Sequence, residues 1–117
     1  RCSWCLARLR GPARAGALGM TGEALPAETA ANGGLIWKAR PDDHLMAEAR
    51  ALAAKLANGP TLGLAHTKRA IDQAVNNSFE DQLAVEAAYQ KTCGASSDYA
   101  EGVSAFLQKR APEFTGT

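Results

Sequence analysis

The 117-residue chain has few aromatic residues and few cysteines, and both shortages limit what it can be. Aromatic residues make up 6% of the sequence, so a core built from this chain alone would bury little area per side chain. We therefore expect its stability to depend on contacts outside the chain. The three cysteines are an odd number and give no disulfide framework, which favours reduced thiols and a cytoplasmic location.

The chain also lacks an excess of charge of either sign and a long apolar run. Thirteen Lys and Arg residues against twelve Asp and Glu residues leave a net charge of +1. This balance gives no strong field to attract nucleic acid or a membrane surface. No apolar segment approaches the roughly 20 residues that span a bilayer. We expect neither a nucleic-acid partner nor a membrane partner.

Helical patterns cover most of the sequence, so we expect a mostly α fold. Short helices are predicted at residues 3–10, 12–20 and 26–32, with breaks at Gly11, Gly22 and the Gly33-Gly34 pair. A long helix at 42–56 and three longer C-terminal helices at about 60–75, 78–93 and 98–110 follow, each with an apolar face. Ser78 with Asp81 predicts a capping box, and Ser97 or Asp98 is expected to cap the last helix.

One short segment, Leu35 to Lys38, is strand-like and is bounded by glycine and Pro41. We expect the chain to divide into two parts after this segment. Residues 1–41 would hold the short helices and the strand-like segment. Residues 42–117 would form a helical region suited to oligomerisation.

Metal or redox chemistry has weak support in the sequence. Cys2 and Cys5 have the spacing that begins many zinc or redox sites, but a second ligand pair is missing. Cys93, His44 and His66 are scattered without metal spacing. We expect no metal site.

Nucleophilic and acid–base chemistry are also weakly supported. A pair of Cys93 and His66 has no local signature, so Cys93 is expected to be a buried, inert thiol. His44 is expected to lie on the surface. Asp42 and Asp43 are expected to cap a helix rather than to form a general acid/base pair.

The last helix and the tail that follows it carry the most specific pattern. It has an acidic start at Asp98, a Glu101-Gly102-x-x-Ala105-Phe106 core and a Lys109-Arg110-x-Pro112-x-Phe114 finish. This pattern resembles the C-terminus of the enoyl-CoA hydratase/isomerase (crotonase) family. Residues 26–36 and 67–70 also fit family elements in the expected order. The run before Trp4 departs from the family, which has small residues there, and Arg10 stands where an apolar residue is usual.

The resemblance implies the C-terminal helical region of a crotonase-type fold and an enzyme that acts on acyl-CoA. In the family, backbone N–H groups stabilise the thioester enolate and a carboxylate moves a proton. Those groups precede the matching region, so no residue of this chain is expected to be catalytic, and the chain alone is expected to be inactive. Residues 34–38 and 110–116 look most like the epoxyphenylacetyl-CoA isomerases of phenylacetate breakdown, which open a ring epoxide to an oxepin. An enoyl-CoA hydratase and a non-catalytic helical interaction module are the alternatives.

The resemblance also implies two CoA-binding residues in the last helix, Phe106 and Lys109. An aromatic face can stack on adenine, and an ammonium group can pair with phosphate. Phe106 shares a stripe with Tyr99 and Val103, so core packing is an equal alternative, and Lys109 could equally be a solvated lysine. The family resemblance further implies a homotrimer or hexamer, and no cofactor other than the coenzyme A thioester that is the substrate.

Overall fold

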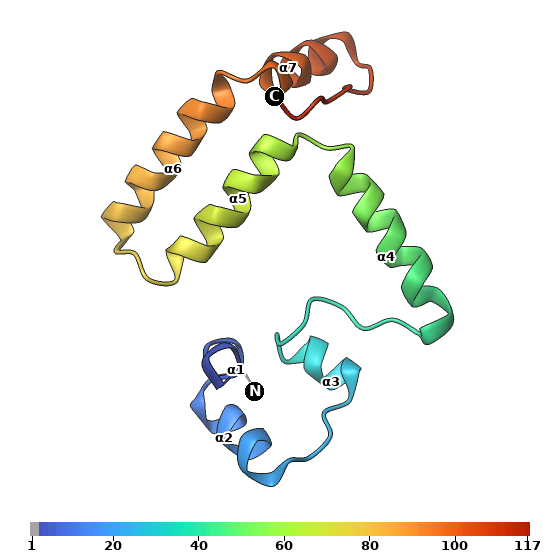
Figure 1. Cartoon of the computed structure of the whole chain (residues 1–117), viewed down its shortest axis with the longest axis vertical. Coiled ribbons are helices and arrows are strands. Elements are labelled where there is room, and N and C mark those ends of the chain that lie inside the picture. The colour runs from blue at the N-terminus through green and yellow to red at the C-terminus, as the bar shows by residue number, and fades with distance from the viewer. Residues whose placement is uncertain (1–2) are drawn as a thin grey trace. The chain divides into compact units, whose positions relative to one another are not determined.

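The structure is a computed structural model that describes residues 3–117, and this range holds seven helices (Figure 1). Three short helices come first and four longer ones follow, so the expected mostly α fold is confirmed. Each predicted helix is present, with ends that differ from the prediction by at most two residues. The helices are α1 (Ser3–Arg10), α2 (Pro12–Thr21), α3 (Ala27–Asn32), α4 (Asp42–Ala57), α5 (Thr61–Ala74), α6 (Phe79–Gly94) and α7 (Ser97–Gln108).

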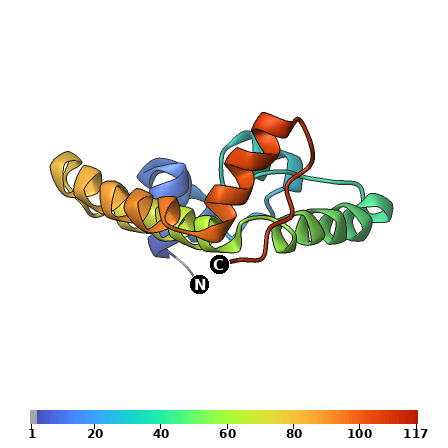
Figure 2. The same ribbon diagram turned by 90° about the horizontal axis from the view of Figure 1, so that it is seen from above.

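Contacts between residues divide the chain into two compact units, Arg1–Met46 and Ala47–Thr117. In the first unit, α1 packs against α2. In the second, α5 lies beside α6, and α6 contacts α7. Residues 109–117, the tail of the chain, then run back along α7, as Figures 1 and 2 both show. The expected functional division after residue 41 stays a prediction.

The strand expected at Leu35–Lys38 is wrong, because this stretch has bends and irregular backbone. Gly34 has a φ of 76° and ends α3 by donating its N–H to the Ala31 carbonyl at 3.0 Å. The Leu35 N–H bonds to the Ala30 carbonyl at 2.9 Å, which completes a Schellman motif. The first amide of the apolar run therefore caps a helix, and a strand also needs a neighbouring strand to pair with.

Arg10, which replaces the apolar residue expected by resemblance, lies against this same helix end. Its Nη1 atom donates to the Thr29 carbonyl at 3.3 Å, where the last carbonyls of α3 favour a cation. The guanidinium occupies the space that a Cβ on Gly33 would need. A glycine at residue 33 therefore makes room for the arginine at residue 10.

Serine hydroxyls begin the last two helices. Ser78 Oγ accepts the Asp81 N–H at 3.1 Å and donates to the Asp81 carboxylate at 2.8 Å, so the predicted cap is confirmed. The cap expected at Ser97 or Asp98 lies instead at Ser96, whose Oγ accepts the Tyr99 N–H at 3.1 Å. A hydroxyl three residues before Tyr99 reaches that amide, and this leaves Asp98 for another partner.

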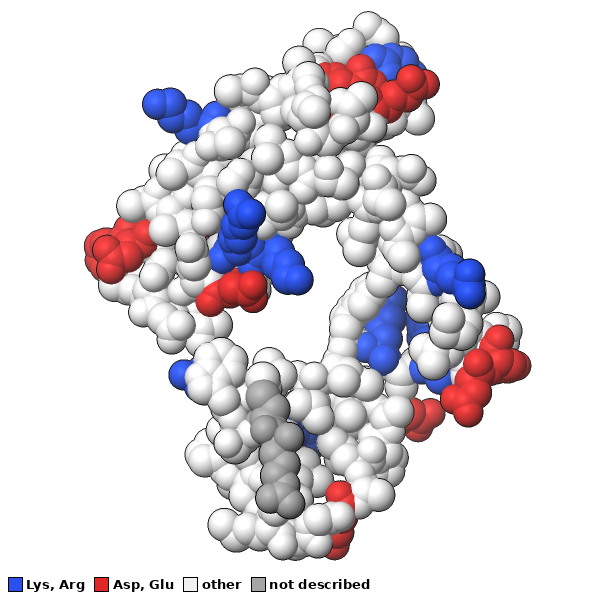
Figure 3. Space-filling view, viewed as in Figure 1, with Lys and Arg blue, Asp and Glu red and all other residues white. Residues whose placement is uncertain are grey.

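The buried core of the described chain is very small. Its buried apolar residues are Ala30 and Ala105. Large apolar side chains are exposed on every helix except α3, and Figure 3 shows broad uncharged surface between scattered charged groups. Such wide apolar exposure is unusual for a protein that functions as an isolated monomer. Among residues 3–117, no helix is both long and apolar enough to cross a membrane.

Replacing Gly34 with alanine should destabilise the first unit by about 1–2 kcal/mol, because a Cβ is disfavoured at a left-handed φ. The control is Gly16→Ala in α2, where a new Cβ would meet nothing within 4 Å and alanine favours the helix. Chemical denaturation of both variants measures the difference. Equal stability of the two variants would contradict the proposed role of Gly34.

Candidate functional site

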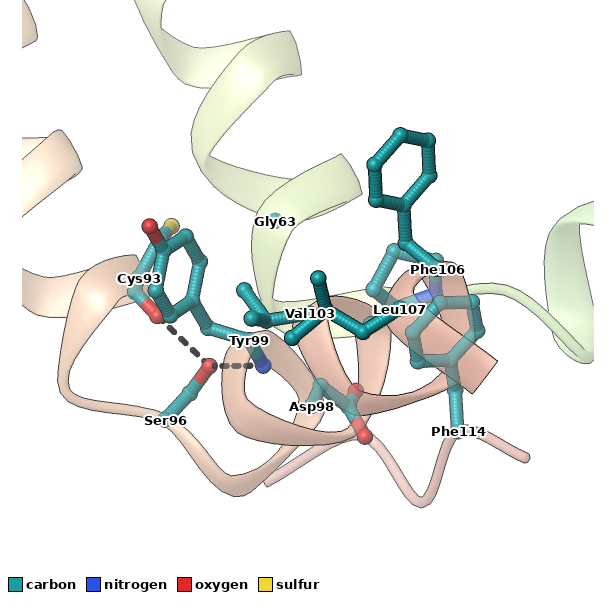
Figure 4. Close-up of a pocket in the computed structure, with 11 residues that line it drawn as sticks. Gly63, Cys93, Ser96, Asp98, Tyr99, Val103, Phe106, Leu107 and Phe114 are labelled. Atoms are coloured by element: carbon teal, nitrogen blue, oxygen red, sulfur yellow. Dashed lines mark hydrogen bonds between the residues drawn. The ribbon is translucent and has the colours of Figure 1, made fainter. Parts of the chain in front are cut away.

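An apolar groove of about 440 Å³ lies between α7, the tail, the start of α5 and the end of α6. All of its residues belong to the second unit. Figure 4 shows Val103, Leu107 and the rings of Tyr99, Phe106 and Phe114 around it. The full lining is Pro60, Gly63, Cys93, Ser96, Asp98, Tyr99, Gly102, Val103, Phe106, Leu107 and Phe114.

Phe106 is 82% exposed and lies on the wall of this groove. Tyr99 and Val103, which share its stripe, are 57% and 44% exposed. The stripe is therefore not packed in a core within this chain. An exposed aromatic ring beside an apolar groove is available to stack on a flat ligand group.

Lys109 ends α7 in a left-handed conformation with a φ of 54°. Its N–H bonds to the Phe106 carbonyl at 3.2 Å, and the Arg110 N–H bonds to the Ala105 carbonyl at 3.0 Å. Lysine rarely adopts this conformation, which usually belongs to glycine or asparagine. The turn reverses the chain and leaves the Lys109 side chain exposed at the end of the helix.

Asp98 lies in the first turn of α7 and is only 4% exposed. Its two carboxylate oxygens accept the N–H groups of Thr115 at 2.7 Å and Gly116 at 2.9 Å. Its own N–H donates to the Thr117 carbonyl at 2.9 Å. Helix N-termini favour negative charge, so both the start of α7 and the N–H groups of the tail stabilise this buried carboxylate.

Glu101, one turn further along α7, holds the start of the tail. Its carboxylate pairs with both terminal nitrogens of Arg110, with an Nη2–Oε2 distance of 2.8 Å, and accepts the Glu113 N–H at 2.8 Å. The hydrogen bond from Arg110, followed by that from Glu113, lowers the pKa of Glu101 from 4.5 to about 2. The same pairing raises the pKa of Arg110. These bonds hold the start of the tail alongside α7.

Comparison with known proteins assigns this arrangement to a family. The sequence model of enoyl-CoA hydratase/isomerase matches residues 1–117. The chain belongs to the enoyl-CoA hydratase/isomerase family. The expected fold class, the helical C-terminal region of a crotonase-type fold, is confirmed with it.

Individual members of the family are strongly similar to the chain. It is 47% identical over 114 residues to the 1,2-epoxyphenylacetyl-CoA isomerase of Escherichia coli K12, and the match covers 97% of the chain. It is 46% identical over 114 residues to a probable enoyl-CoA hydratase of Rhodobacter capsulatus, again over 97% of the chain. A solved enoyl-CoA hydratase from Polaromonas sp. JS666 matches 97% of the chain with a TM-score of 0.90 and 34% identity.

The chain spans less than half the length of these relatives. The match covers 44% of the isomerase, of the probable hydratase and of the solved hydratase. Family membership therefore describes the chain.

The two CoA-binding residues inferred from the family resemblance lie at one end of α7. Phe106 is in the last turn of the helix and Lys109 is its C-cap. Their role in binding stays a prediction. The sequence reasoning missed Asp98 and Glu101 as the groups that hold the tail, although it singled out both positions as part of the family pattern.

Other candidate groups do not form reactive pairs within residues 3–117. Cys93 is half-buried rather than buried, and no hydrogen bond joins it to His66. His66 instead packs against Tyr89, with ring centroids 4.4 Å apart and ring planes tilted by 36°, in a second groove between α5 and α6. His44 is exposed beside Asp43, 3.6 Å away.

Cysteine chemistry at the start of the chain differs from expectation. Cys5 is disulfide-bonded, so the expectation of reduced thiols is wrong for this residue. An odd total of cysteines does not prevent one pair from forming. Cys2 lies outside the described residues. Within the described part, no three His, Cys, Asp or Glu side chains gather where they could hold a metal ion.

The low pKa of Glu101 predicts a specific loss of stability in acid. A carboxylate with a lowered pKa stabilises the folded state above its ordinary pKa of 4.5, and this contribution is lost as the pH falls towards about 2. We expect Glu101→Gln to be less stable than the unaltered protein at pH 7, with a gap that narrows below pH 4.5. Urea denaturation across pH 7 to 2.5 measures the gap.

Arg110→Gln provides the partner control for this measurement. Because Glu101 and Arg110 act as one pair, the double variant should lose less stability than the sum of the two single variants. A gap between Glu101→Gln and the unaltered protein that does not change with pH would show that the pair does not shift the Glu101 pKa.

Proposed function

We propose that the chain is the C-terminal, CoA-contacting region of an acyl-CoA isomerase that acts on an epoxyphenylacetyl-CoA type thioester. The observation that carries this proposal is 47% identity, over nearly the whole chain, to the 1,2-epoxyphenylacetyl-CoA isomerase of Escherichia coli. The tail residues 110–116 and the segment 34–38, which look most like that subfamily, point the same way. The reaction would pass through a stabilised thioester enolate.

In this proposal the chain supplies binding groups and no catalytic residue. Phe106 offers an exposed ring for the adenine of CoA, beside a groove that is almost wholly apolar. Lys109 offers an ammonium group for phosphate at the end of the same helix. The left-handed backbone at Lys109 supports a functional role, because such strained conformations cluster at binding sites.

The proposal includes an assembly and an environment. We propose a homotrimer or hexamer in the cytoplasm that needs no cofactor besides the CoA thioester, and that has no nucleic-acid or membrane partner. Support for the assembly comes from apolar side chains on α4 that this chain leaves uncovered, namely Leu45, Met46, Leu52 and Leu56. Their exposed fractions range from 38% to 59%.

A hydratase is the second candidate, and it has an observation of its own. The probable enoyl-CoA hydratase of Rhodobacter capsulatus is 46% identical to the chain, only slightly less than the isomerase. A non-catalytic helical interaction module is the third candidate, because no residue of this chain is expected to be catalytic.

Mass spectrometry of the product distinguishes the first two candidates. The whole protein that carries this chain would be incubated with 1,2-epoxyphenylacetyl-CoA and, separately, with a 2-enoyl-CoA. Isomerisation leaves the mass of the thioester unchanged but changes its chromatographic retention, whereas hydration adds the mass of one water. We expect the epoxide alone to give a new chromatographic peak of unchanged mass. Hydration of the enoyl-CoA alone would favour the hydratase, and no turnover with bound CoA thioester would favour the module.

Replacing Lys109 separates stability from binding. Lys109→Gly should stabilise the fold by about 1 kcal/mol, because glycine adopts the left-handed φ without strain. The same variant should bind CoA more weakly, since the charge opposite phosphate is gone. Denaturation and calorimetric titration with CoA measure the two effects.

Lys109→Arg is the matched variant for this test. It keeps a positive charge in the same strained backbone, so CoA binding should be retained while stability stays close to that of the unaltered protein. Unchanged CoA affinity in Lys109→Gly would remove Lys109 from the proposed site.

A further inference from the structure

The tail of the chain is fastened to α7 at several points by two side chains. Glu101 accepts from the Arg110 guanidinium and the Glu113 N–H, and Asp98 accepts from the N–H groups of Thr115 and Gly116. Residues on either side of Phe114 are therefore tied to one helix. An extended segment with no regular partner would otherwise keep much of its conformational freedom.

The attachment of Asp98 is not an ordinary surface contact. Asp98 is 4% exposed, and its two oxygens bind two consecutive amides at 2.7 and 2.9 Å. A buried charge is costly unless such bonds compensate it. Ser97 Oγ adds a hydrogen bond to the Thr117 carbonyl at 2.6 Å, next to the Asp98 N–H that donates to the same oxygen.

This fastening fixes one wall of the apolar groove. Phe114 lies between the two attached segments, and its ring faces Gly102, where Cε1 would be 3.7 Å from a Cβ. Phe114 and Phe106 both line this groove (Figure 4). A Cβ at Gly102 would make an ordinary van der Waals contact with this ring, so the Phe114 ring lies directly over the backbone of α7.

The other end of the fastened segment adjoins Lys109. The bond from the Arg110 N–H to the Ala105 carbonyl and the pairing of Arg110 with Glu101 both hold the reversal that begins at Lys109. This pairing also neutralises the charge of Glu101.

We propose that Asp98 and Glu101 are positioning residues for the acyl-CoA ligand. They act through the tail, by holding Phe114 as a wall of the groove and by fixing the reversal that presents Lys109. The proposal rests on the proposed function, since it takes the ligand to be a CoA thioester. In this proposal the carboxylates of Asp98 and Glu101 bind the tail rather than the ligand.

The test measures tail order and ligand affinity in the same variants of the whole protein. Hydrogen exchange of a peptide covering residues 110–117 reports tail order, and calorimetric titration with phenylacetyl-CoA, an analogue without the epoxide, reports affinity. Asp98→Asn puts an amide donor against one of the two tail N–H groups. We expect faster exchange and a dissociation constant raised roughly tenfold, the fold-change of one lost charge-assisted hydrogen bond.

Two further variants separate positioning from general destabilisation. Phe114→Ala should weaken binding similarly without faster exchange at Thr115 and Gly116, and Phe114→Leu should restore part of the affinity because it refills the wall. Asp72→Asn is the matched control, since it makes the same chemical change at an exposed site on α5 outside the groove. Asp72→Asn should change neither readout.

The outcomes separate this inference from the proposed function. Faster tail exchange in Asp98→Asn with unchanged affinity would overturn the inference and leave the proposed function intact, and so would unchanged affinity in Phe114→Ala. If the unaltered protein does not bind phenylacetyl-CoA, the proposed function fails and the inference fails with it. If Asp98→Asn does not fold, the Phe114 pair still decides the question.

Discussion

Hydrogen bonds at helix ends, rather than a buried core, define most of the local structure of this chain. Among the described residues, the buried apolar ones are two alanines, so burial contributes little to the choice of conformation. The Ser78 and Ser96 caps, the Schellman motif at Gly34 and the reversal at Lys109 each satisfy backbone groups that a helix end leaves unpaired. These local bonds determine where the helices begin and end, and the apolar faces between the ends remain uncovered.

Within that framework α7 is the most heavily constrained element. Ser96 fixes its start, Asp98 and Glu101 fix the tail along it, and Lys109 ends it in a conformation that lysine normally avoids. Phe106 and Lys109, which the family resemblance assigned to CoA, lie at the C-terminal end of this constrained helix. An ordered helix end beside an apolar groove is a preorganised surface, and preorganisation reduces the entropy that a ligand must overcome on binding.

Much of this fold could be predicted from the sequence, and the exceptions have physical causes. Helices followed from apolar spacing together with Gly, Pro and Ser at the breaks, because those signals are local. Leu35–Lys38 was wrongly expected to be a strand, since the pattern of its side chains does not reveal that the Leu35 N–H is already used by α3. The cap was misplaced by one residue because Ser96, Ser97 and Asp98 are all good capping residues.

The candidate site was predictable in part for a similar reason. Phe106 and Lys109 came from a family pattern, whereas nothing in helical periodicity showed that the stripe of Tyr99, Val103 and Phe106 would be exposed rather than packed. The role of Asp98 and Glu101 depends on a chain reversal that places residues 110–117 beside residues 98–101. Lysine at the reversal gave no sign of it, because glycine or asparagine is the usual signal for a left-handed turn.

The two sides of α7 carry separate tasks. Asp98, Glu101 and Ala105 follow one line along the helix, towards the tail, while Tyr99, Val103 and Phe106 follow another, towards the groove. Substitutions at Tyr99, Val103 and Phe106 can therefore change the size and shape of the groove, although Asp98 lines the groove as well as holding the tail. A helix divided in this way can change the lining of its groove while its own architecture stays the same.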